Sequence, residues 1–239
     1  MLLCESISVS ARHVRFAGHT GKVVVRRWYI LVGILLLYVL VIITPVESVG
    51  APLRIVLFGA LLEFALRTRR HGRRGSRAAI IVTLALAIAT IVAAAVGSKT
   101  ALTVVAQASI ILLVCASIAV LGLGLVQAGS TVDANTVTDV LSVYLLLALL
   151  FAALHQLFGA VISPYLNGAP SPPNASDTLY FSIITMTTVG FGDVTPASNV
   201  ARAVASTEAI VGQLYLVSVV AVVVSHYRRP DRGSDSGQP

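Results

Sequence analysis

Two glycines alternate with bulky side chains between Thr188 and Asp193, which read Thr-Val-Gly-Phe-Gly-Asp; we refer to residues 188–193 as the glycine segment. Glycine readily adopts a positive φ, and a backbone of alternating handedness can point successive carbonyl oxygens to one side. Strands of this kind around one axis would form rings of oxygens that replace the water shell of a dehydrated monovalent cation. The segment is therefore predicted to bind cations through its backbone, with the Thr188 hydroxyl as one further layer.

The residues before the glycine segment predict a short helix. The apolar run from Thr178 suits a helix of about 12 residues with Asp177 as its N-cap, which is too short to cross a bilayer. Such a helix must enter the membrane and return, which is tolerated only where protein or a water-filled cavity satisfies the backbone. The negative end of its dipole, near Met186 and Thr187, would favour a cation.

The composition of the chain is that of a membrane protein. Of its 239 residues 56% are hydrophobic and 11% charged, against about 25% charged in soluble domains. At about 20 apolar residues per span there is room for roughly six spans, which excludes a large extramembrane catalytic domain. The predicted fold is an all-α membrane protein with six transmembrane helices and a re-entrant helix and loop between the last two. The predicted spans are 28–44, 52–66, 79–97, 101–126, 139–162 and 199–226.

The basic residues predict how these spans are oriented. Fourteen of the 17 Lys and Arg residues fall on one side of the six-span drawing, and such an excess marks the cytoplasmic side. Both termini are then predicted to be cytoplasmic, in a multi-pass protein of the cell membrane, and 163–198 opens to the outside. The run from Arg67 to Arg77 is read either as a topogenic loop alone or also as a site for anionic lipid. Nucleic acid is not predicted as a partner.

The glycine segment resembles the selectivity filter of the potassium-channel family, with Phe191 where Tyr is more common. Tyr180 and Phe181 resemble the paired aromatics of the pore helix that form a cuff around the filter, and Asp193 resembles the acidic residue just outside it. Glu208 to Gln213 resemble part of the inner helix, with Gly212 at the hinge position. The resemblance covers 139–228.

The resemblance implies a channel that conducts K⁺ passively as a homotetramer, because one chain supplies one of four filter strands. It places the re-entrant pore helix and filter loop between spans five and six, and it implies no cofactor besides the transported ion. The implied K⁺ ligands are Thr188, Val189, Gly190 and Phe191, and Gly192 completes the filter. The predicted parts are an N-terminal tail (1–27), a four-span bundle that resembles a voltage sensor in span number (28–130), a pore domain (131–229) and a C-terminal tail (230–239).

Two departures from the family leave alternatives open. Residues 101–126 contain no charged side chain, and moving one charge through the membrane field is worth about 2.3 kcal/mol per 100 mV, so only weak voltage dependence is predicted. Phe191 lacks the hydroxyl that a Tyr would use to tie the filter to its cuff. A weakly selective cation channel and a non-conducting regulatory subunit therefore remain alternatives. An enzyme is not predicted, since no nucleophile with a base partner stands out.

Two side-chain pairs and the positions of two further side chains are also predicted. The Tyr180 hydroxyl is the predicted partner of Asp193, and Glu63 is four residues before Arg67 in the order that favours a helical ion pair. Arg54 is predicted to extend outward from its span. His155, near the outer end of span five, is predicted to pack at the membrane interface, with sensing of external pH as the alternative.

Overall fold

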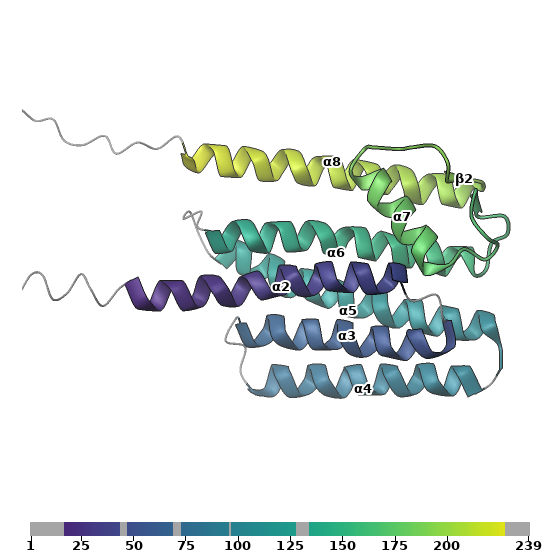
Figure 1. Ribbon diagram of the computed structural model, residues 1–239, viewed down its shortest axis with the longest axis horizontal. Coiled ribbons are helices and arrows are strands. Elements are labelled where there is room, and N and C mark those ends of the chain that lie inside the picture. Colours follow the sequence, from purple (N-terminus) through teal and green to yellow (C-terminus); the bar gives the residue numbers. More distant parts are fainter. Residues whose placement is uncertain (1–16, 44–46, 69–72, 96, 128–133, 228–239) are drawn as a thin grey trace, which may run out of the picture.

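The chain is described by a computed structural model, which covers residues 17–43, 47–68, 73–95, 97–127 and 134–227. Among these residues, long helices lie side by side along one axis, and a short helix lies at one end of the bundle (Figure 1). The long helices are α2 (Ala17–Ile43), α3 (Glu47–Thr68), α4 (Arg73–Ala95), α5 (Lys99–Gln127), α6 (Ala134–Gly159) and α8 (Asn199–Tyr227). The short helix is α7 (Ala175–Met186), and the strands β1 (Leu166–Asn167) and β2 (Thr195–Pro196) flank it in the chain.

Each predicted span corresponds to one long helix, with differences at the ends. Three stretches among the residues searched are long and apolar enough to cross a membrane, namely Arg77–Ala95, Lys99–Leu123 and Thr136–Gly159. Trp28–Ile42 is a shorter apolar helical segment. The mainly helical prediction is thus confirmed.

Two helices extend beyond the predicted apolar runs. Helix α2 begins at Ala17, within the predicted tail, because a helix satisfies its own backbone hydrogen bonds and can continue outside an apolar run. Helix α3 has 22 residues, so at about 1.5 Å per residue it spans about 30 Å, the thickness that run 52–66 alone could not reach. Residues 1–16 and 230–239 of the predicted tails, and 69–72 of the arginine-rich loop, lie outside the described residues.

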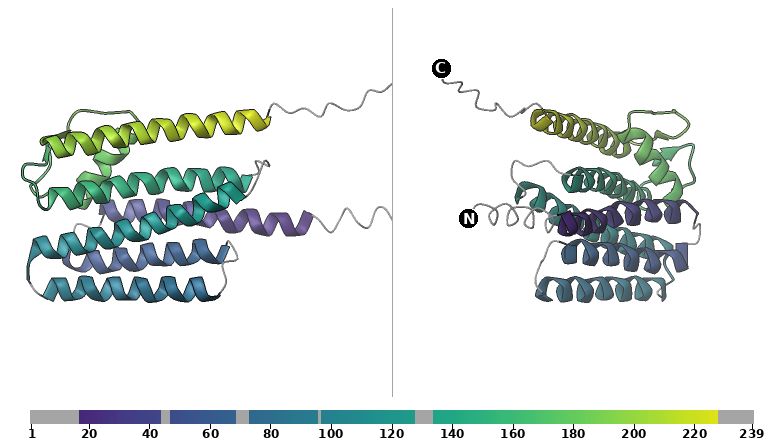
Figure 2. Two further views of the ribbon diagram at one scale, coloured as in Figure 1. Left: turned by 180° about the vertical axis from the view of Figure 1, so that it is seen from behind. Right: turned by 60° about the vertical axis from the view of Figure 1, so that its left-hand side comes forward.

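The helices pack in a staggered stack rather than a ring. Helix α4 lies at one edge against α3 and α5, α5 packs on α6, and α8 packs on α6 and α7 (Figures 1 and 2). Fully buried apolar side chains fill the spaces between the helices, whereas α4 exposes a row of large ones, as expected for a helix that faces lipid. The buried examples are Ile34, Ile55, Val114, Leu121 and Leu146, and the exposed ones on α4 are Ile81, Ile88 and Ile91.

The two short strands hold the chain before α7 against the chain after the glycine segment. They pair antiparallel, with Leu166 opposite Pro196 and Asn167 opposite Thr195. Beside them Gly168 has φ +79°, and a Cβ at this position would lie 2.0 Å from the Asp193 carbonyl oxygen, which no side chain could accommodate without a backbone shift. The ends of the segment that contains α7 are therefore clamped together at one end of the bundle (Figure 1).

Candidate functional site

The N-cap of helix α7 lies three residues earlier than predicted. Asn174 is the N-cap, with an extended backbone, and its side-chain oxygen accepts a hydrogen bond of 2.8 Å from the backbone N–H of Asp177. The prediction of Asp177 as the cap was wrong, because Asn174 is an equally good capping residue and follows two prolines that cannot continue a helix. Asp177 lies in the first turn of the helix, where its carboxylate interacts favourably with the positive end of the helix dipole.

The backbone of the glycine segment alternates in handedness. Thr188, Gly190 and Gly192 have φ values of 59°, 50° and 83°, and these are the positive-φ residues of the segment. The sequence predicted alternation through the glycines, but Thr188 is the one described non-glycine residue with a positive φ, a conformation that costs free energy for a β-branched side chain. Both Val189 and Gly190 direct their N–H groups back to the Ile184 carbonyl oxygen, at 2.9 and 3.1 Å.

The side chains of the glycine segment are exposed in the single chain. Phe191 is 71% exposed and Val189 52%, and Thr188 and Asp193 are also exposed. Space is open around Gly190 and Gly192, since a Cβ added at either would meet no atom within 4 Å. The segment therefore lies on a free face of the chain, where other chains or ions could contact it.

Tyr180 holds the outer end of the glycine segment to α7. Its hydroxyl donates to Asp193 Oδ2 at 2.8 Å, which confirms the predicted pair, and this hydrogen bond raises the pKa of the Tyr180 hydroxyl. The ring of Tyr180 also stacks on Phe191, with centroids 6.5 Å apart and planes at 4°. The neighbouring Phe181 points elsewhere, into the protein, where its edge meets the His155 ring at a centroid distance of 4.9 Å.

A buried polar cluster lies behind α7, and it consists of His155, Tyr165, Ser182 and Glu208. The His155 ring lies between its two partners, with Nε2 2.9 Å from Glu208 Oε2 and Nδ1 3.0 Å from the Tyr165 hydroxyl. Glu208 Oε1 contacts the Ser182 hydroxyl, which also lies 2.8 Å from the Ala148 carbonyl oxygen. Burial raises the pKa of the Tyr165 hydroxyl. The cluster thus joins α6, α7, α8 and the loop that carries Tyr165.

The sequence interpretation missed this cluster. His155 was predicted to pack at the interface, which is wrong, since the side chain has no exposed surface and neither has that of Glu208. The burial has a physical cause, because α6, α7 and α8 all close over the ring. An ionisable residue in an apolar span signals a site with a buried partner, and Glu208 and His155 both gave this signal. Their separation of 53 residues gave no indication that they pair.

Gly212 lies where α8 passes closest to the end of α7. A Cβ there would come within 3.2 Å of the Met186 carbonyl oxygen and 3.3 Å of Met186 Cγ, so little room exists for a side chain. The same Met186 carbonyl oxygen accepts a hydrogen bond of 3.1 Å from the Tyr144 hydroxyl on α6. The end of α7, directly before the glycine segment, is thus held by α6 and touched by α8.

Polar residues also line a small cavity between α7 and helices α3, α5 and α6. Arg54 is 6% exposed, so the prediction that it extends outward was wrong, since α3 turns this residue toward α5 and α6 rather than lipid. It lines a cavity of about 30 Å³ together with Gln107 and Gln156, whose side chains share a hydrogen bond of 2.7 Å.

The predicted pair of Glu63 and Arg67 is confirmed, with Arg67 Nε 2.6 Å from Glu63 Oε1.

Comparison with known proteins supports a channel. Residues 140–229, which include α7, the glycine segment and the polar cluster, match a family described as "Ion channel". The chain is also 30% identical over 97 residues to the inward rectifier potassium channel Kirbac3.1 of Paramagnetospirillum magnetotacticum. This match covers 41% of the chain and 31% of the relative, so the chain matches about a third of the length of that protein.

No solved structure matches the chain at a significant level. The family match falls on the part of the chain that carries the glycine segment. The family and the relative point to an ion channel of a membrane rather than an enzyme, and they support a relationship to potassium channels.

Proposed function

We propose that this chain is a potassium-selective channel of the cell membrane, which conducts K⁺ passively as a homotetramer with the glycine segment as its filter. The observation that carries the proposal is the positive φ at every second residue of an exposed segment, Thr188, Gly190 and Gly192. Such alternation can direct successive carbonyl oxygens to one side, as a ring of K⁺ ligands requires. The named relative, a potassium channel, supports the choice of ion.

The exposed surfaces of the single chain support the tetramer. One glycine segment supplies one side of a coordination ring, so further chains are needed to surround an ion. Helix α8 exposes an apolar stripe at helical spacing, Ile210, Leu214 and Val217, each more than half exposed. In a tetramer this stripe would line the inner pore or pack on a neighbouring chain, which would explain why it is exposed in the single chain.

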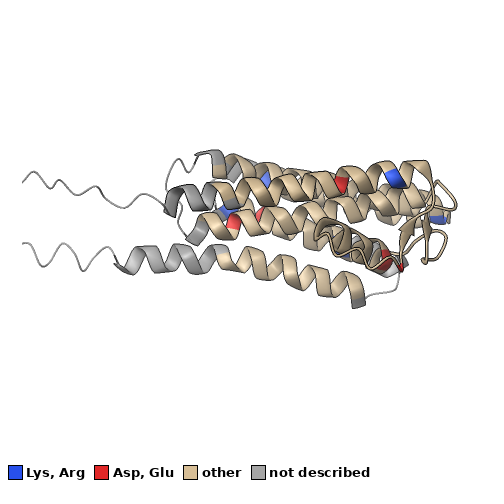
Figure 3. Ribbon diagram, turned by 90° about the horizontal axis from the view of Figure 1, so that it is seen from above, with Lys and Arg blue, Asp and Glu red and all other residues tan. Residues whose placement is uncertain are grey.

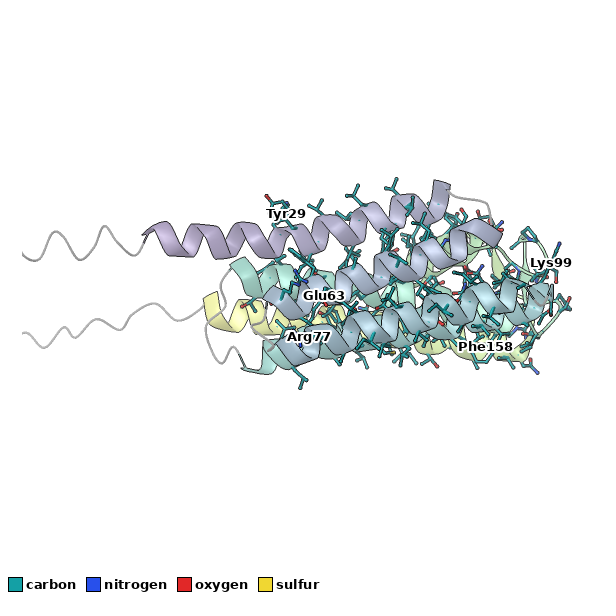
Figure 4. The ribbon with its side chains drawn as sticks, turned by 90° about the horizontal axis from the view of Figure 1, so that it is seen from below. Tyr29, Glu63, Arg77, Lys99 and Phe158 are labelled. Carbon is teal, nitrogen blue, oxygen red and sulfur yellow. The ribbon has the colours of Figure 1, made fainter. Side chains whose placement is uncertain are left out.

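The distribution of charge supports six spans with both termini in the cytoplasm. Most of the charged residues lie toward the two ends of the bundle (Figure 3). Arg77 lies at the end where α2 begins and α8 ends, and Lys99 lies at the opposite end, beside the loops around α7 (Figures 1 and 4). The Arg67 to Arg77 region would then face the cytoplasm, where it could bind anionic lipid.

The experiment that tests the proposal is a recording from the purified protein in a planar bilayer, with K⁺ on one side and Na⁺ on the other. A reversal potential near the K⁺ equilibrium value is expected. A value near zero would indicate a weakly selective cation channel, and silence in active reconstitutions would indicate a non-conducting subunit.

A substitution in the glycine segment provides the control. Gly190→Ala places a Cβ at φ 50°, where the space is open but the backbone is strained, so the expected result is a folded protein without selective current. A Gly190→Ala protein that conducts K⁺ like the parent would contradict the assignment of the filter.

A further inference from the structure

The polar cluster is sealed from water, so its hydrogen atoms must be accounted for within it. His155, Ser182 and Glu208 have no exposed surface, and Tyr165 is 1% exposed. Buried polar groups of this kind are paired in nearly all folded proteins, because an unpaired one costs free energy. The number of hydrogens available for each contact therefore decides the protonation state.

The Ser182 hydroxyl has one hydrogen but two oxygen neighbours. It lies 2.8 Å from the Ala148 carbonyl oxygen and also contacts Glu208 Oε1. A carbonyl oxygen only accepts, so the hydrogen between Ser182 and Ala148 belongs to Ser182. The hydrogen between Ser182 and Glu208 must then come from the carboxyl group.

The donors and acceptors of the remaining contacts in the cluster can then be assigned. A protonated Glu208 keeps Oε2 as an acceptor, which takes the Nε2–H of His155 at 2.9 Å. The Nδ1 of a neutral His155 then accepts from the Tyr165 hydroxyl at 3.0 Å. The order of donation is Tyr165 to His155, His155 to Glu208, Glu208 to Ser182 and Ser182 to Ala148, with one hydrogen for every contact.

An ion pair between a charged His155 and an ionised Glu208 fits the contacts less well. Both nitrogens of the imidazolium would donate, which leaves the Tyr165 hydrogen without an acceptor among the described residues. Ser182 would have to share its single hydrogen between Ala148 and Glu208. Two buried charges also lose their hydration, at a cost that their attraction often fails to repay. Among the described residues outside the cluster, Tyr38 on α2 is the titratable group that interacts electrostatically with Glu208, and its hydroxyl donates to the Leu145 carbonyl oxygen at 2.6 Å.

We propose that Glu208 is held as a neutral carboxylic acid, and that its proton is the link through which α8 positions α7. Ser182 lies one turn before the end of α7 at Met186, which directly precedes the glycine segment. Loss of the proton would turn Oε1 into an acceptor that competes for the Ser182 hydrogen and weakens the bond between Ser182 and Ala148. Glu208 is thus a positioning residue. Its effect on current rests on the proposed function, whereas its protonation does not.

Two substitutions of Glu208 separate the neutral acid from the ion pair. In Glu208→Gln the amide can donate to Ser182 and its oxygen can accept from His155, so the order of donation is kept. The Glu208→Gln protein should therefore keep its melting temperature within a few degrees and its K⁺ flux in liposomes within about twofold. Glu208→Leu should lower the flux about tenfold or more, because it leaves the Nε2–H of His155 without its acceptor and the Ser182 oxygen without the donor that Glu208 supplied.

Infrared spectroscopy of the full-length protein tests the proton directly. The parent should show the C=O stretch of a buried protonated carboxyl group, which is absent from Glu208→Gln and present in the control Glu63→Gln. If that band persists in Glu208→Gln, or if Glu208→Gln is as unstable as Glu208→Leu, the neutral acid is disproved. If the parent gives no K⁺ flux but the band and the stabilities behave as expected, the proposed function fails and the proton assignment stands.

Discussion

At the scale of the residue, the ring of Phe191 is what distinguishes this glycine segment. The ring stacks on Tyr180 and is 71% exposed, so a hydroxyl added to it would reach beyond the chain, toward a neighbouring subunit in the proposed tetramer. We expect Phe191→Tyr to keep K⁺ selectivity and to slow the loss of current during sustained activity by a factor of about 2 to 10, as one hydrogen bond of about 0.5–1.5 kcal/mol would give. Macroscopic currents at constant voltage measure this. Phe191→Leu, which lacks the ring, is the control and should hasten the loss; a Phe191→Tyr channel that admits Na⁺ as readily as K⁺ would refute the expectation.

At the scale of the element, α5 corresponds to the fourth predicted span, which would be the voltage-sensing helix in the proposed channel, but it has no charged residue from Thr100 to Gln127. The open probability should therefore change only weakly between negative and positive potentials, because the helix moves no charge through the field. Single-channel recording over a range of voltages measures this dependence. A steep curve, equivalent to several charges per channel, would show that another group moves, and the buried Arg54 on α3 would be examined first through Arg54→Gln.

The contact between α8 and α7 leads to a second expectation at this scale. Gly212→Ala would bring a Cβ within 3.2 Å of the Met186 carbonyl oxygen, which Tyr144 also holds. Overpacking of this kind costs about 1–3 kcal/mol, so the melting temperature should fall and the openings should shorten. Gly122→Ala on α5, where a Cβ would meet nothing within 4 Å, is the matched control and should leave both unchanged. Equal stability of the two variants would mean that α8 does not press on the end of α7.

At the scale of the whole molecule, the exposed glycine segment and the apolar stripe on α8 are incomplete in one chain. Chemical cross-linking in detergent should trap species of up to four chains and no larger ones, because four segments close the coordination ring. The products can be counted by gel electrophoresis and their mass confirmed by light scattering. A dimer as the largest species would leave the ring open and would rule out the proposed pore.

The sequence predicted those features of the site that depend on neighbouring residues. The glycine segment, the short helix before it and the bond from Tyr180 to Asp193 all lie within 188–193 and the 13 residues before it, where spacing limits what can meet. The positive φ of Thr188 was not foreseeable, since threonine disfavours it and only the surrounding chain enforces it. The choice of Asn174 over Asp177 as the N-cap was not foreseeable either, because both side chains can cap a helix.

The polar cluster and the burial of Arg54 depend on tertiary contacts instead. His155 and Glu208 belong to different helices, and the apolar residues around each would suit a lipid-facing helix equally well. What brings them together is the wedge of α7 between α6 and α8, which no single-helix pattern encodes. The same holds for Arg54, whose face of α3 is fixed by α5 and α6.

The pairing of β1 with β2 makes the main chain from Asn167 to Thr195 a closed ring, which contains the outer loop, α7 and the glycine segment. Surface loops usually accept insertions and deletions because their ends are free to adjust. Here a residue gained or lost between Gly168 and Asn174 would have to be absorbed inside the ring, where Gly168 already touches the backbone of Asp193. Among descendants of this sequence, this loop should therefore vary by substitution only. Insertions and deletions should accumulate in other loops.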